Sequence, residues 1–196
     1  PPASEMGVPG GQLGIGTAFT YDAAPGAANP SRVWFGVSNG AISAASYPSV
    51  AQTNLKSLGV LVTDGKSFVA DEMSDAIYAV QRLDGAAPAF RVTSTDAQGR
   101  WAVVKEIVSD PQADTILFTV AFQALKGQPG DYRLFLNYTP RIGGSGAGDL
   151  SRIADGRAQA WDEQAGVYST LASSPPPALA ISGYPGQSDL RSELAD

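Results

Sequence analysis

Short apolar segments, each ended by turn residues, recur along the chain from Arg32 to Ser182. In the first of them Val33, Phe35 and Val37 fall on one face, which is the period of two that a half-buried β-strand requires. Turn dipeptides such as Asp64-Gly65 separate the segments and predict tight hairpins. The pattern predicts further strands over 58–63, 66–69, 77–83, 90–95, 101–108, 115–125, 132–139, 156–161, 167–173 and 178–182.

The composition agrees with many strands joined by tight turns. The 196 residues include 22 Gly and 14 Pro, and 43% are hydrophobic, as expected of an all-β domain rather than of long helices or disorder. Apolar segments are spread evenly, so we predict one antiparallel β-sandwich over 31–185. Within it, the strand over 115–125 is apolar on both faces and is expected at the centre of a sheet.

The two ends of the chain differ from this pattern. Residues 1–30 are rich in Gly, Ala and Pro with little periodicity, and are expected to form an extended N-terminal arm. Over 186–196, Ser188 is a possible N-cap, and Leu190 and Leu194 are at helical spacing. These residues are expected to start a linker helix. No apolar run approaches the roughly 18 to 20 residues of a membrane span.

The charge and the missing residue types exclude several classes of function. A formal charge of −6 and a pI near 4.6 offer no basic stripe for nucleic acid or for an anionic membrane surface. With no His and no Cys, Ser-His and Cys-His nucleophiles and the usual zinc sites are impossible. There is no phosphate-binding loop, and Gly14-Ile15-Gly16 lacks the context of a dinucleotide fingerprint. We therefore predict neither a metal nor a cofactor.

Carboxylates and tryptophans are the remaining candidates for a site. Asp71 with Glu72, Asp155, and Asp162 with Glu163 could act as a glycosidase acid and base, although solvated turns are the ordinary explanation for such acids. Trp34 and Trp101 lie in strand patterns and are expected in the core. Trp161 is the best candidate for an exposed sugar-stacking ring, with core packing as its alternative.

A series of short motifs resembles the N-terminal domain of bacterial glycoside hydrolase family 15 enzymes, the glucoamylases and glucodextranases. The order and spacing of the motifs, rather than any one of them, carry the resemblance, which covers almost the whole chain. The motifs are Ser31-Arg32-Val33-Trp34-Phe35, Asn39-Gly40, Tyr47-Pro48, Leu58-Gly59, Val62-Thr63-Asp64-Gly65-Lys66, Asp110-Pro111 with Asp114, Asp131-Tyr132-Arg133-Leu134 leading to Pro140, and Gly146-Ala147-Gly148.

The resemblance implies a large antiparallel β-sandwich of the galactose mutarotase type, a supersandwich, followed by a linker and an (α/α)6 barrel. In that barrel two glutamates hydrolyse α-linked glucose chains with inversion, and they would lie beyond Asp196. The chain is therefore expected to be a non-catalytic domain of an exo-acting α-glucosidase, with that barrel as its partner. The resemblance also implies a secreted or periplasmic protein whose signal peptide has been removed.

The same resemblance implies a contact surface. Loop residues held between strands are expected to pack on the barrel, with Tyr47 as the strongest contact. They are Asn39, Gly40, Tyr47, Pro48 and Arg141. For these residues the alternative is local loop packing within the domain. For the whole chain the alternatives are a free-standing carbohydrate-binding module that binds α-glucan, and a mutarotase-like epimerase, a class that relies on His for proton transfer.

Overall fold

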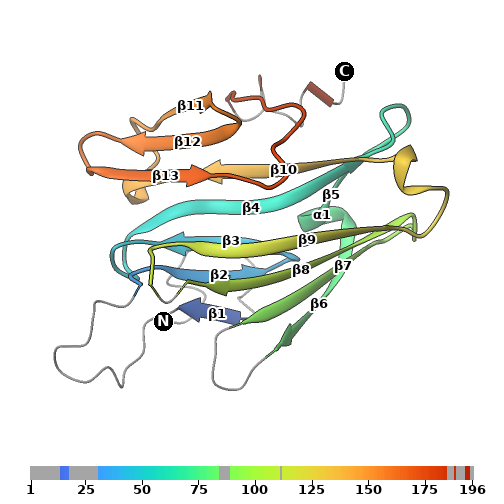
Figure 1. The fold of residues 1–196 in the computed structure, drawn as a ribbon, viewed down its shortest axis with the longest axis horizontal. Helices are drawn as coiled ribbons and strands as arrows, with labels where there is room; N and C mark the ends of the chain where they lie inside the picture. The colour runs from blue at the N-terminus through green and yellow to red at the C-terminus, as the bar shows by residue number, and fades with distance from the viewer. Residues whose placement is uncertain are drawn as a thin grey trace.

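The computed structural model describes residues 14–17, 31–83, 89–110, 112–184, 188 and 193–194. Almost all regular structure in this part of the chain is β-strand, with one turn of α-helix, α1 (Glu72–Asp75), between two strands (Figure 1). Two short 3-10 helices, η2 (Pro129–Asp131) and η3 (Ile142–Gly144), lie in loops. The strands are β1 (Gly14–Thr17), β2 (Trp34–Ser38), β3 (Ala41–Ser46), β4 (Thr53–Thr63), β5 (Val69–Asp71), β6 (Ala76–Arg82), β7 (Phe90–Asp96), β8 (Trp101–Ser109), β9 (Ile116–Ala124), β10 (Arg133–Pro140), β11 (Leu150–Ala154), β12 (Arg157–Asp162) and β13 (Val167–Leu171).

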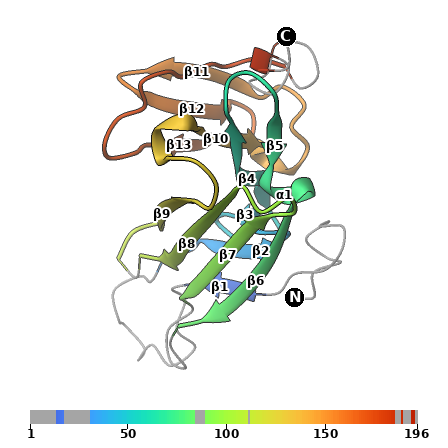
Figure 2. The ribbon, with the colours of Figure 1, turned by 90° about the vertical axis from the view of Figure 1, so that its right-hand side faces the viewer.

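The strands form three antiparallel sheets. A six-stranded sheet has the order β1-β2-β3-β4-β10, with β5 also paired to β4, and a four-stranded sheet has the order β6-β7-β8-β9. The third sheet, β11-β12-β13, lies next to β10 and at the opposite end of the molecule from β1 and β6 (Figures 1 and 2). The predicted all-β sandwich is confirmed, and α1 is the crossing point between its two larger sheets.

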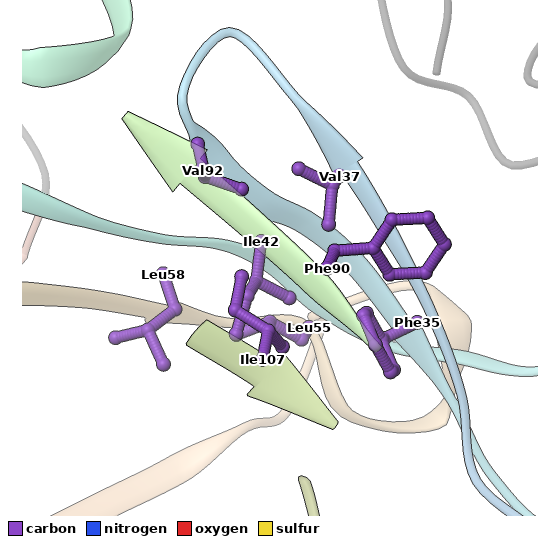
Figure 3. Packing of buried hydrophobic residues seen from close by; sticks show 8 residues of the cluster. All are labelled: Phe35, Val37, Ile42, Leu55, Leu58, Phe90, Val92 and Ile107. Atoms are coloured by element: carbon purple, nitrogen blue, oxygen red, sulfur yellow. The ribbon is translucent and has the colours of Figure 1, made fainter. Parts of the chain in front are cut away.

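The core fills the space between the six-stranded and four-stranded sheets. A first cluster takes its side chains from β2, β3 and β4 on one side and from β7 and β8 on the other; Phe35 and Phe90 meet edge to face across it, with ring centroids 6.1 Å apart. Figure 3 shows its members: Phe35, Val37, Ile42, Leu55, Leu58, Phe90, Val92 and Ile107. Trp101 is fully buried in a second cluster with Val60, Val62, Ala70 and Val103. Its predicted place in the core is confirmed.

A smaller third cluster joins the three-stranded sheet to the rest. Ile142, Ala160 and Val167 are buried in it, and the partly buried rings of Tyr47 and Tyr138 pack against them. The Tyr138 hydroxyl also donates a 2.8 Å hydrogen bond to Ser169 Oγ on β13. Packing and this bond, rather than a backbone ladder, hold the small sheet in place.

Two hairpin turns need residues that tolerate positive φ. Asn39 and Gly40 have φ of 49° and 78° between β2 and β3, and Asp155 and Gly156 have φ of 50° and 68° between β11 and β12. Both central residues are left-handed, as a type I′ turn requires. The hairpin predicted at Asp64-Gly65 joins β4 to β5, but its turn is not a tight two-residue turn. Only Gly65 has a positive φ there, and Asp64 Oδ1 instead accepts backbone hydrogen bonds that hold a wider loop before β5.

Several sequence expectations differ from the structure. The strand over 116–124 is the edge of its sheet, not its centre, and Leu117 on its outer face is 50% exposed. Residues 178–182 form no strand, while β3 and β11 were not predicted.

Of the predicted arm, only β1 is described, and it pairs with β2. Most of the predicted linker helix over 186–196 lies outside the described residues. No helix in the part of the chain that the structure describes is long and apolar enough to span a bilayer.

Candidate functional site

A cleft of about 430 Å³ opens between the two larger sheets where β9 and β13 face each other. Its floor is apolar and includes Leu55 and Leu58 of β4 and Phe118 of β9, and its walls include Tyr138 and the whole length of β13. The side chains of β9 that point toward the core are only half-buried, because β9 is an edge strand. We call this space the interlayer cleft.

An ion pair is fixed at the rim of the interlayer cleft. Asp114 accepts 2.7 Å and 2.8 Å bonds from the backbone N–H and the guanidinium of Arg32, which also donates to the Tyr47 hydroxyl at 2.7 Å. Partial burial pulls the pKa of Asp114 upward, but the bonds from Arg32 outweigh it and hold this pKa below its ordinary value. At neutral pH the carboxyl group is therefore ionised, with its charge balanced by Arg32, and it is a poor proton donor.

The acidic residues singled out from the sequence do not come together in the interlayer cleft. Glu72 is buried in the core next to Lys105, and Asp71 caps α1 by accepting from Met73 N at 2.9 Å. Asp155 forms a hairpin turn. Asp162 is buried and accepts the backbone N–H groups of 164 and 165, whereas Glu163 is exposed. Among the described lining residues, Asp114 is the one carboxylate, so the cleft holds no pair for glycoside hydrolysis.

The predicted contact residues fall into two groups. Asn54 links Tyr47 to Arg141 in the first group. Its side-chain amide donates to the backbone carbonyl of Tyr47 at 2.6 Å, and its backbone carbonyl accepts from the backbone N–H of Arg141 at 3.0 Å. Pro48 is exposed beside Tyr47. Asn39 and Gly40 form the second group at the other end of β3, about 20 Å away at roughly 3.3 Å per residue. We call the first group, Tyr47, Pro48 and Arg141, the Tyr47 end.

The outer face of the three-stranded sheet carries Trp161. Leu150 on β11 and Tyr168 on β13 pair with it on either side, so the three side chains form one row across the sheet. The next row on the same face consists of Arg152, Gln159 and Thr170. Trp161 is half-buried and Tyr168 is 72% exposed. Tyr168 was not predicted as a site residue, although the turn before Gly166 places it opposite Trp161 on the neighbouring strand.

The fold and the site define the class of this chain: an antiparallel β-sandwich with an open interlayer cleft that contains no acid pair among its described residues. A family model described as glucodextranase, domain N, matches residues 3–196. The chain belongs to this family.

Two relatives extend the comparison. A glucoamylase from Clostridium sp. (strain G0005) is 37% identical over 134 residues, which are 68% of this chain and 18% of that protein. The crystal structure of a bacterial glucoamylase complexed with acarbose superposes with a TM-score of 0.65 at 33% identity, covering 76% of this chain and 23% of that one. The chain thus spans about a fifth of the length of the relatives it matches.

Proposed function

We propose that this chain is the non-catalytic N-terminal domain of a glucoamylase-like, exo-acting α-glucosidase of the glucan 1,4-α-glucosidase or glucodextranase type, in family 15 of the glycoside hydrolases. The observation that carries the proposal is the family match over 3–196 combined with relatives named glucoamylase. The interlayer cleft supports it, because its single described carboxylate is neutralised by Arg32. The hydrolytic groups then belong to a separate (α/α)6-barrel domain.

The domain's role in this proposal is to pack on the barrel and stabilise it through the Tyr47 end. Pro48 and Arg141 are exposed there, while Asn54 holds the backbone beneath them rigid. A rigid, exposed group of this kind can form a contact with little loss of conformational entropy. Asn39 and Gly40 have a sufficient explanation as a type I′ turn.

The test compares the longer protein that contains this chain with the isolated chain. Arg141→Ala should lower the Tm of the full-length enzyme and leave the Tm of the isolated domain unchanged. Arg91→Ala, on the outer face of the four-stranded sheet, is the control; it breaks only an exposed ion pair with Glu106 and should change both Tm values little and equally. Equal melting of the full-length enzyme with and without Arg141→Ala would place the barrel contact elsewhere.

The non-catalytic part of the proposal has its own assay. The isolated chain should release no glucose from maltose, starch or dextran. Release that survives repurification and disappears in Glu163→Gln would assign the chemistry to this domain. A secreted or periplasmic location follows from the same proposal, because a polymeric glucan does not cross a membrane, and cell fractionation of the source organism tests it.

A further inference from the structure

The outer face of the three-stranded sheet combines aromatic rings with hydrogen-bonding groups in two parallel rows. Trp161 and Tyr168 are direct neighbours across β12 and β13, and strands lie about 4.8 Å apart. Leu150, 47% exposed, extends this row across β11. Two aromatic side chains and a leucine thus form a continuous apolar strip that runs across the strands.

The second row supplies polar groups beside this strip. Arg152 Nε donates to Gln159 Oε1 at 2.6 Å, which fixes both side chains on this face. The Arg152 guanidinium lies over the Trp161 ring, 5.7 Å from its centroid, so it covers part of that ring face and holds its remaining N–H groups against the strip. Thr170 completes the row and is exposed. Guanidinium and amide groups are therefore fixed on one side of the rings, with an exposed hydroxyl in the same row.

From this arrangement we propose that the outer face of β11–β13 binds a neutral glucan chain, with sugar rings stacked on Trp161 and Tyr168 and hydroxyls bonded to Arg152 and Gln159. A pyranose ring has an apolar face of C–H groups and a rim of hydroxyls. The row with Trp161 and Tyr168 matches the apolar face, and the row with Arg152 and Gln159 matches the hydroxyls. The choice of an α-linked glucan rests on the proposed function, since that is the substrate class of the parent enzyme.

The size of this face favours a saccharide over a protein partner. Five residues along three strands span about 17 Å by 14 Å, a footprint on the order of 200 Å², whereas a stable protein interface buries about 800 Å² per partner. One contact of the described segment after β13 lies on the other side of this sheet. Ser182 contacts Ser151 at 2.8 Å, and Ser151 points to the opposite side of β11 from Leu150 and Arg152 because alternate residues face opposite ways.

Affinity gel electrophoresis of the 196-residue chain tests this binding. Its migration should be retarded in gels that contain soluble starch, and parallel gels with dextran distinguish α-1,4 from α-1,6 linkages. Trp161→Ala and Tyr168→Ala should each weaken the retardation by about tenfold or more. Ile77→Ala removes an equally exposed apolar side chain, 71% exposed, on β6 of the four-stranded sheet, and should bind like the unchanged chain.

Two further variants keep the test decisive. Tyr168→Phe retains the ring and should bind starch normally if stacking is the interaction, and Trp161→Phe should remove the fluorescence change that starch causes in the unchanged chain. Tyr168 is exposed enough for Tyr168→Ala to fold even if Trp161→Ala does not. Absence of retardation in both polysaccharides, or retardation that the two alanine variants leave intact, would overturn the proposal. Neither result depends on the barrel, so a failure of this binding proposal is distinguishable from a failure of the proposed function.

Discussion

Glu72 and Lys105 form an ion pair inside the sandwich, where Glu72 is fully buried and Lys105 is 2% exposed. Glu72 also accepts hydrogen bonds from Ser94 Oγ at 2.7 Å and from the backbone N–H of Val60 at 2.9 Å. One carboxylate therefore joins β4 of the six-stranded sheet to β7 and β8 of the four-stranded sheet. Burial raises the pKa of Glu72 and lowers that of Lys105, and each partner opposes the shift of the other.

Breaking this pair from one side should destabilise the fold strongly. Glu72→Gln or Lys105→Met alone should lower the free energy of unfolding by about 3–5 kcal/mol, because each leaves an uncompensated buried charge. The double variant should lose clearly less than the sum of the two, since no charge is left buried. Urea denaturation measures all three variants.

The chain offers a matched exposed pair as the control. Arg91 and Glu106 are cross-strand neighbours on β7 and β8, 2.6 Å apart and half-exposed. The same double-mutant cycle there should give a coupling energy below about 1 kcal/mol. If the two single losses at Glu72 and Lys105 simply add, the buried pair contributes no coupling and this account of the junction is wrong.

Asp96 and Arg100 predict a pH dependence of stability. Asp96 is buried and accepts two 2.7 Å bonds from the Arg100 guanidinium, which itself lies 3.8 Å from the centroid of the Phe68 ring. Burial pulls the pKa of Asp96 upward, but the bonds from Arg100 prevail and hold this pKa below its ordinary value. A lowered folded-state pKa stabilises the fold above the unfolded-state pKa of about 3.9, and this contribution is lost as the pH falls through the folded-state value.

Asp96→Asn should therefore cost about 2 kcal/mol at pH 7. The difference from the unchanged chain should shrink as the pH falls below about 4, where the native carboxyl also becomes neutral. Urea midpoints measured from pH 2.5 to 7 provide the comparison. A difference that stays constant over this range would mean that Asp96 acts through packing rather than charge.

Gly40 is required by a close approach as well as by its turn. Its φ is 78°, and a Cβ at this position would lie 2.5 Å from Ser94 Oγ and 3.1 Å from Glu72 Cγ. Gly40→Ala should cost about 3 kcal/mol from the left-handed backbone and the overpacking together. Gly99 has a similar φ of 67° with no atom within 4 Å, so Gly99→Ala isolates the backbone cost of about 1 kcal/mol. Equal decreases in Tm in the two variants would show that the close contacts with Ser94 and Glu72 add no cost.

The alternation of apolar residues made most strands predictable, because a half-buried strand carries its period in the sequence. Strands β7 and β8 follow it closely. Strand β3 was missed because AISAAS is small and nearly uniform, and all but one of its six residues are buried. Strand β9 was misplaced because its outward Leu117 is apolar yet exposed. Apolar side chains on both faces do not by themselves distinguish a central strand from an edge.

The candidate site was harder to predict because it depends on register. Trp161 could be singled out from its residue type, but its row with Leu150 and Tyr168 exists only once β11, β12 and β13 are paired. The contact surface predicted from Asn39 and Tyr47 stays a prediction. Its residues lie at the two ends of β3, a separation that their nearness in the sequence does not show.

Tyr47 should stabilise the isolated domain as well as any contact with the barrel. Its ring packs against the cluster of Ile142, Ala160 and Val167, and its hydroxyl accepts a bond from Arg32. Tyr47→Ala should therefore cost the isolated chain about 2 kcal/mol, less than a fully buried ring would. Tyr47→Phe keeps the ring and should cost below about 1 kcal/mol, because the lost bond involves an exposed arginine. Only a loss in the full-length enzyme beyond that in the isolated chain measures the barrel contact, and equal losses would show that Tyr47 acts within this domain alone.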